Sequence, residues 1–167
     1  MVKANNFCKV LFISLFLISS LIFSSEKNTV SVNVLEQNLN YVILEYKIHN
    51  YELNEINIKD QLYHEVILDD EPNFINKYDP KLPHVNRSLI IPDNSSMNIS
   101  ILESNSTFIE NINIIPSKGN PTRNFDINKI PYVKGQTYNV DYNYPGELYD
   151  IKDPYILRDF RGQVLQI

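Results

Sequence analysis

The sequence predicts an all-β domain, an antiparallel β-sandwich or jelly roll, preceded by a hydrophobic signal helix. Apolar and polar residues alternate in several short segments, which is the period of a strand with one buried face. Turn-forming Pro, Gly and Asn residues separate these segments, as at 92–94 and 144–146. Helical periodicity is scarce after the amino terminus. Many short strands with regular spacing are typical of sandwiches and jelly rolls.

The amino terminus predicts the compartment. Residues 10–23, VLFISLFLISSLIF, carry no charge, and Lys3 and Lys9 precede them. As a helix this run would span about 21 Å, too short for a bilayer core of about 30 Å. A basic start, a short apolar run and a small-residue exit indicate a secretory signal peptide at 1–25, with the folded domain at 26–167. An uncleaved anchor is the alternative, because the exit is not Ala-x-Ala. We expect a secreted chain that meets the membrane only through this segment.

The clearest strand pattern lies at 137–144, TYNVDYNY. Tyr138, Val140, Tyr142 and Tyr144 would share one face. We interpret this face as core, in preference to an aromatic platform for sugars or peptides. The same reasoning predicts strands at 41–48, 62–68, 87–91, 98–103, 106–115, 155–160 and 162–167.

Two connections and the chain end complete the outline. The polar segments 70–84 and 117–134 are long for a compact domain, and such connections are either functional or disordered. The chain stops at Ile167 inside a predicted strand. A terminal apolar strand would form an exposed edge, which proteins usually cover. We therefore expect the domain to be truncated at its carboxyl end and the native product to continue.

Composition argues against several function classes. The net charge is −5 and no basic cluster occurs, so nucleic acid is not an expected partner. The single cysteine, Cys8, lies in the predicted signal, which leaves no thiol nucleophile, disulfide or thiolate metal site after cleavage. His49, His64 and His84 lack metal-ligand spacing, and no Gly-x-Ser-x-Gly turn occurs. We expect no catalytic residue, no metal and no cofactor, and hence no enzyme in this chain as it stands.

Two further groups of residues remain candidates for simple roles. Asp69, Asp70, Glu71 and Asp79 could supply calcium ligands, but their spacing does not match a calcium loop, which favours a solvated acidic loop. Asn-x-Ser/Thr triplets are glycan acceptors in secreted chains, with those at 93–107 the first expected. They begin at Asn86, Asn94, Asn98 and Asn105.

Three blocks, in order along the chain, carry a family resemblance. They are 82–92 (LPHVNRSLIIP), 111–116 (NINIIP) and 144–167 (YPGELYDIKDPYILRDFRGQVLQI). Together they resemble the amino-terminal propeptide of gingipain-type cysteine peptidases over about residues 60–167. The last block is the most specific, through the spacing of Pro145, Arg158, Phe160, Arg161 and Gly162.

The resemblance implies a β-sandwich that acts as folding chaperone and active-site inhibitor of its peptidase. The family's catalytic Cys and His lie downstream, so the implied partner is a cognate cysteine peptidase domain in cis, beyond residue 167. The resemblance also implies a basic side chain in the substrate pocket. Loop 116–124, PSKGNPTRN, offers Arg123 first and Lys118 second. The alternative for this loop is a solvated segment with two ordinary surface charges.

The arginines near the carboxyl end and the role of the whole chain each allow a second interpretation. Arg158 and Arg161 bracket Asp159, which we interpret as a tight turn relieved by Gly162, although cleavage after an Arg would be a functional use. The chain could also be a free-standing secreted β-sandwich for adhesion or binding. A third possibility is a standalone inhibitor of a separate peptidase.

Overall fold

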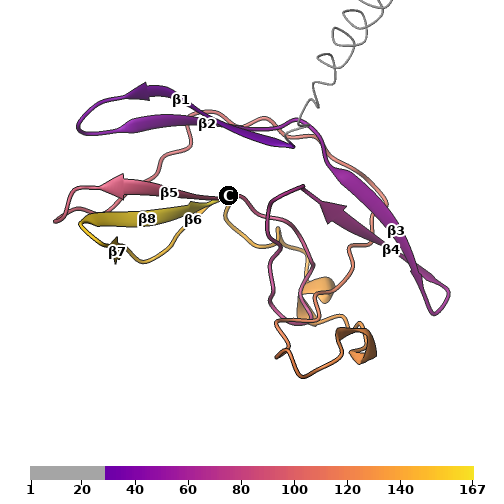
Figure 1. Cartoon of the computed structure of the whole chain (residues 1–167). Helices are drawn as coiled ribbons and strands as arrows, with labels where there is room; N and C mark the ends of the chain where they lie inside the picture. The colour runs from indigo at the N-terminus through magenta and orange to yellow at the C-terminus, as the bar shows by residue number, and fades with distance from the viewer. Residues whose placement is uncertain (1–28) are drawn as a thin grey trace, which may run out of the picture.

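The computed structural model describes residues 29–167, so the predicted signal peptide and its helix lie outside the described residues. Regular structure in this part is almost entirely β (Figure 1). No helix among residues 29–167 is long and apolar enough to cross a membrane. The strands are β1 (Val30–Gln37), β2 (Val42–Ile48), β3 (Glu52–Ile58), β4 (Gln61–Ile67), β5 (Asn86–Ile91), β6 (Asp150–Ile151), β7 (Tyr155–Leu157) and β8 (Phe160–Gln166), with two 3-10 turns, η2 (Ile127–Lys129) and η3 (Gln136–Asn139).

The first four strands form two hairpins. β1 pairs antiparallel with β2, and the Asn38 side-chain oxygen accepts hydrogen bonds from the Asn40 and Tyr41 amides to close the turn. β3 pairs antiparallel with β4 through the two-residue turn Lys59–Asp60. Both turn residues have positive φ, 48° and 63°, as the mirror-image turns that suit a right-twisted hairpin require.

The remaining strands form one antiparallel sheet around the carboxyl-terminal strand. β5 lies on one side of β8, while β6 and β7 both pair with its other side. Val85 and Ile167 extend the β5–β8 ladder by two backbone hydrogen bonds, 2.6 and 2.9 Å long. The expectation that the terminal strand would form an exposed edge is therefore wrong: β8 is the centre of its sheet.

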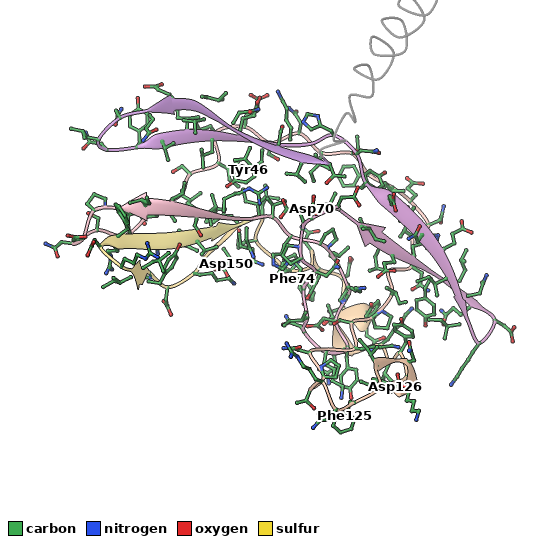
Figure 2. All side chains as sticks on the ribbon, viewed as in Figure 1. Tyr46, Asp70, Phe74, Phe125, Asp126 and Asp150 are labelled. Carbon is green, nitrogen blue, oxygen red and sulfur yellow. The ribbon has the colours of Figure 1, made fainter. Side chains whose placement is uncertain are left out.

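The core of the described part is small. In Figure 1 the β1–β2 hairpin lies above the β5–β8 sheet, and Figure 2 shows Tyr46 of β2 pointing into the space between them. The buried apolar side chains in the described part are Tyr63, Leu68, Val85, Ile115 and Leu165. The prediction of an all-β, antiparallel domain is confirmed.

Five predicted strands correspond to observed strands, and one of the five is split between two strands. The segments 41–48, 62–68, 87–91 and 162–167 match β2, β4, β5 and β8. The predicted strand 155–160 instead contains β7, a turn at Arg158–Asp159, and the first residue of β8. The strands β1, β3 and β6 were not predicted.

Three predicted strands are wrong. Residues 98–103 are irregular, and the segment 106–115 contributes only an isolated bridge between Ile114 and His64. In place of a strand at 137–144 the chain forms η3, followed by bends. Among the described residues no strand pairs with the 137–144 segment, so its alternating pattern has no neighbouring backbone to bond. Its side chains bond irregular chain instead: the Thr137 hydroxyl donates to the Asp79 carboxylate, and the Tyr138 hydroxyl donates to the Ile114 carbonyl at 3.0 Å. Tyr142 is exposed, so the expected shared core face does not form.

Candidate functional site

The long loop at 117–135 is attached at both ends to one residue, Tyr78. The Tyr78 amide donates to the Ser117 carbonyl at 2.9 Å, and the Tyr78 carbonyl accepts from the Gly135 amide at 2.8 Å. The Ser117 amide also donates to the Asp79 carbonyl at 2.8 Å. Tyr78 itself has φ 77°, a conformation that few non-glycine residues adopt. The base of the loop is therefore held by backbone hydrogen bonds although it contains no strand.

Close packing reinforces this base. Gly119, with φ 78°, faces the Lys77 side chain, where an added Cβ would lie 3.0 Å from the Lys77 Cβ. Gly135 lies against Tyr78, and a Cβ there would lie 3.1 Å from the Tyr78 carbonyl oxygen.

After the loop the chain forms η3, which contains Tyr138. Burial raises the pKa of the Tyr138 phenol, and Tyr63 and Asp79 raise it further. Tyr138 therefore stays a neutral hydrogen-bond donor to the Ile114 carbonyl.

Lys118 has a structural role inside the loop. Its Nζ donates to the Ile127 carbonyl at 2.9 Å and lies 4.1 Å from the centre of the Tyr132 ring. A carbonyl acceptor and a cation–π contact satisfy the ammonium group within the loop. The side chain ties the two sides of the loop together. Lys118 is thus the less suitable of the two predicted inhibitory residues.

Arg123, in contrast to Lys118, is exposed to solvent. It lies in a turn closed by a 3.0 Å hydrogen bond from the Phe125 amide to the Thr122 carbonyl, and it is exposed. Asp126 caps η2 by accepting from the Asn128 amide at 3.0 Å, which shapes the chain directly after the turn. Figure 2 shows Phe125 and Asp126 at the end of the molecule away from the β1–β2 hairpin. The loop therefore presents a guanidinium group to solvent on a defined turn.

The three histidines lie apart from one another, and each contacts its own set of neighbouring residues. The buried His64 accepts from the Asn113 amide through Nδ1 at 3.2 Å, and its backbone bonds Asn113 and Ile115. The buried His84 ring lies 4.5 Å from the Phe74 ring, and its pKa is lowered by burial and then by Lys152, against the opposing effect of Glu71. His49 is exposed and hydrogen-bonds Ser31. Within residues 29–167 no group of three His, Cys, Asp or Glu side chains is placed to hold a metal ion.

The acidic residues of the 70–84 connection do not converge. Asp69 and Asp70 are exposed, whereas Glu71 forms a two-point ion pair with Arg87, with distances of 2.6 and 3.2 Å. Asp79 accepts from the Thr137 hydroxyl. The Glu71–Arg87 pair fastens the connection to β5, and its planar, bidentate geometry is the kind that gives an Arg–carboxylate pair its strength.

The arginines near the carboxyl end belong to a hairpin. Arg158, with φ 56°, and Asp159 form the exposed turn between β7 and β8, as the tight-turn interpretation predicts. Arg161 Nε donates to the Ser95 carbonyl at 3.2 Å. Gly162 does not relieve that turn; it accommodates the Tyr155 ring, which would lie 2.7 Å from a Cβ at this position.

The four candidate glycosylation sites are all exposed. Asn86 begins β5, Asn94 lies in the turn after it, and Asn98 and Asn105 lie in irregular chain. Exposure is what a glycan acceptor requires, and their occupancy stays a prediction.

The chain was compared with known protein families, curated proteins and solved structures. The family model Propeptide_C25 matches residues 24–167. The chain belongs to the C25 propeptide family. This family comprises propeptides of cysteine peptidase precursors, so the resemblance stated from the sequence is confirmed. Curated relatives include gingipain R1 of Porphyromonas gingivalis, 43% identical over 93 residues, and gingipain R2 of the same organism, 41% identical over 93 residues.

The alignments with these gingipains cover only a small part of the gingipain chains. The aligned residues are 56% of this chain but 9% of gingipain R1 and 13% of gingipain R2. Among solved structures, the chain is similar to one titled as the complex of P. gingivalis RgpB pro- and mature domains, with a TM-score of 0.76, 30% identity and coverage of 81% of this chain and 71% of that one. A structure titled for the zymogenic latency of gingipain K from P. gingivalis shares the fold, with a TM-score of 0.58, 14% identity and coverage of 86% and 81%.

Sequence reasoning found the loop of this C25 propeptide but missed how it is held. Tyr78 carries no sequence signal for its role, because it acts through its backbone amide and carbonyl. The engagement of Lys118 with Ile127 and Tyr132 depends on how the loop folds back on itself. The small residues Gly119 and Gly135, at the two ends of the loop, were the available hint that backbones approach closely there.

Proposed function

We propose that residues 26–167 act as the folding chaperone and active-site inhibitor of a gingipain-type cysteine peptidase domain that follows in cis, and that residues 1–25 direct secretion of the precursor. Family membership and the likeness to the prodomain in a pro–mature complex support this proposal. In it, the β1–β2 hairpin and the β5–β8 sheet serve as the two layers of a sandwich that carries the loop at 117–135.

The exposed Arg123 on a loop attached at both ends is the observation on which the inhibitory role rests. An arginine fits a carboxylate at the base of a peptidase pocket with two parallel hydrogen bonds, more specifically than a lysine can. The Tyr78, Lys118 and Asp126 contacts order the loop before docking. An ordered loop loses less conformational entropy on binding, and this increases affinity.

Linkage in one chain makes modest affinity sufficient. A segment tethered to its target has an effective concentration on the order of mM when the linker is short. A loop that binds with a dissociation constant in the micromolar range would therefore block the cleft almost completely until the connection is cut. Activation then requires cleavage between the two domains and dilution or destruction of the released domain.

The test of the inhibitory role is an inhibition assay. Residues 26–167, purified alone, are added to the mature domain of P. gingivalis RgpB. We expect inhibition, and we expect Arg123→Ala to raise the inhibition constant by at least about 30-fold, the scale of a central interface hot spot. Lys118→Ala should have a smaller effect, since it only loosens the loop, and Lys129→Ala, exposed in the same loop, is the control.

Two outcomes would contradict this role. Wild-type domain that leaves the peptidase fully active would exclude inhibition by this chain. Inhibition that Arg123→Ala leaves unchanged would exclude the loop as its means. The chaperone role has its own measurement, the yield of active peptidase when the denatured mature domain is refolded with and without residues 26–167. An equal yield in both cases would remove it.

A further inference from the structure

A lysine at the carboxyl end of the 117–135 loop connects the loop to residues outside it. The Lys134 Nζ donates to the Asn113 side-chain carbonyl at 2.7 Å. The same ammonium group lies 5.1 Å from the centre of the Tyr63 ring and 5.0 Å from the centre of the Tyr138 ring. A carbonyl oxygen and the faces of two aromatic rings are all favourable partners for a cation. Lys134 therefore has three partners beyond the loop.

The partners of Lys134 are themselves fixed to β4. The Asn113 amide donates to the His64 Nδ1 at 3.2 Å, and the Asn113 carbonyl accepts from the His64 amide at 2.7 Å. The Asn113 side-chain nitrogen also donates to the Leu62 carbonyl at 2.8 Å. Tyr63 lies between these two β4 residues and is buried. Lys134 thus attaches the end of the loop to a strand that is paired along its whole length with β3.

The other attachments of the loop lead to irregular chain. Tyr78, which bonds both ends of the loop, lies in a turn, and Lys118 bonds residues of the loop itself. A cleft of about 250 Å³ lies between the β3–β4 turn and loop residues 128–132, so the two are not closely packed there. Among residues 29–167, Lys134 is the one loop side chain whose hydrogen bond and cation–π contacts tie the loop to a strand.

The chain between Lys134 and the Arg123 turn has few other supports. Lys118 donates to the Ile127 carbonyl, and Asp126 caps η2. A loop held by few bonds opens at a low free-energy cost, so each bond affects how much of the time the loop is ordered. A loop that adopts its docking conformation for only a fraction of the time binds more weakly in proportion to that fraction. Loss of the Lys134 contacts would therefore weaken the docking of Arg123 while the fold is retained.

We propose that Lys134 is a positioning residue for the inhibitory Arg123. It fixes the carboxyl end of the loop to β4, so that the guanidinium group is presented to the peptidase in one place. Lys134 acts through Arg123 and not by a contact of its own with the peptidase. The inference rests on the proposed function, because the role that it assigns to Lys134 is measured at the Arg123 contact.

The experiment is a double-mutant cycle in the inhibition assay with the mature domain of P. gingivalis RgpB. Lys134→Met removes the cation but keeps a long, unbranched side chain, and Lys129→Met makes the same change at an exposed position of the same loop. We expect Lys134→Met to raise the inhibition constant about five- to tenfold and Lys129→Met to change it by less than about twofold. Lys134→Arg keeps a cation over the two rings and a donor for Asn113, so it should stay within about threefold of wild type.

The Arg123→Ala background separates positioning from a general loss of structure. Because Lys134 acts through Arg123, adding Lys134→Met to Arg123→Ala should change the inhibition constant by less than about twofold. Melting temperatures check that each variant is folded, and Lys134→Gln is a second uncharged variant with the same expected effect.

Three outcomes would overturn the positioning role and leave the proposed function standing. They are an inhibition constant that Lys134→Met and Lys134→Gln leave unchanged, equal effects of Lys134→Met and Lys129→Met, and the same weakening by Lys134→Met with and without Arg123. Wild-type domain that does not inhibit the peptidase would instead overturn the proposed function, and the positioning role with it.

Discussion

Two irregular regions of this propeptide differ sharply in how they are held. The loop at 117–135 is bonded at both ends to Tyr78 and crossed internally by Lys118. The segment at 98–113 is exposed without interruption from 100 to 111, and its contacts with other elements gather near its two ends, at Ile99 and Asn113. The contrast indicates that hydrogen bonds to a neighbouring backbone, and not regular secondary structure, make a loop suitable for presenting a side chain.

The largest expected effect separates the apolar side chains of the two regions. Ile115, at the entrance to the 117–135 loop, is 1% exposed, whereas Phe108 in the 98–113 segment is 92% exposed. We expect Ile115→Ala to lower the free energy of unfolding by about 2–4 kcal/mol, since it leaves a cavity in the small core. Phe108→Ala should change it by less than about 0.5 kcal/mol. Urea denaturation measures both, and similar effects from the two variants would contradict the contrast.

A smaller effect is expected where the loop meets Tyr78. In Gly135→Ala the new methyl group would lie 3.0 Å from the Tyr78 Cβ and 3.1 Å from its carbonyl oxygen. The backbone must move to relieve this crowding. We therefore expect the free energy of unfolding to fall by about 1–2 kcal/mol and hydrogen exchange at the amide of residue 135 to become faster. Asn120→Ala, exposed in the same loop, is the control. Unchanged exchange at residue 135 would show that this attachment is not what orders the loop.

The two regions should also differ toward proteases. Cleavage requires local opening, and an exposed segment with few bonds opens at the lowest free-energy cost. We expect a Glu-specific protease to cut after Glu103 or Glu110 before an Arg-specific protease cuts after Arg123 at equal activity, with a several-fold difference in rate. Mass spectrometry of the fragments over time measures this order. Earlier cleavage at Arg123 would mean that the loop opens more readily than the exposed segment.

The smallest expected effect concerns two buried histidines. The His64 Nδ1 accepts from the Asn113 amide, whereas the buried Nδ1 of His84 has no hydrogen-bond partner within the described residues. Burial lowers the pKa of His84, Lys152 lowers it further and Glu71 partly opposes this. The unfolded chain therefore binds a proton more readily than the folded domain below the ordinary histidine pKa of about 6.5. Stability due to His84 is complete above that pH and is lost as pH falls toward the lower folded value.

Thermal unfolding between pH 7.5 and 5 tests this sign. We expect His84→Leu to flatten the decline of melting temperature with acidification by a few degrees, whereas His49→Leu, at an exposed site, should leave the decline unchanged. A decline that His84→Leu does not alter would place the acid sensitivity in other groups.

Strands were predicted correctly where a segment with a strand-like pattern also has a neighbouring strand to pair with. β4, β5 and β8 carry the expected short apolar runs, and each has an adjacent strand to receive its hydrogen bonds. Prediction failed at 137–144, where alternating tyrosines satisfy the pattern, yet the Tyr138 hydroxyl finds its acceptor at Ile114 in irregular chain. Periodicity reports which side chains could share a face, but a strand also needs a neighbouring backbone, and that neighbour is not encoded locally.

The sequence by itself determined the all-β class, the strands β2, β4, β5 and β8, the long connection that holds Arg123 and Lys118, and the family through its final block at 144–167. Only the tertiary structure decided that β8 is central, that Tyr78 holds both ends of the loop, and that Lys118 is engaged while Arg123 is exposed. The physical reason is that alternation and turn chemistry act over a few neighbouring residues. Pairing between strands far apart in sequence, and bonds from a loop to a distant backbone, arise only when the whole chain is folded.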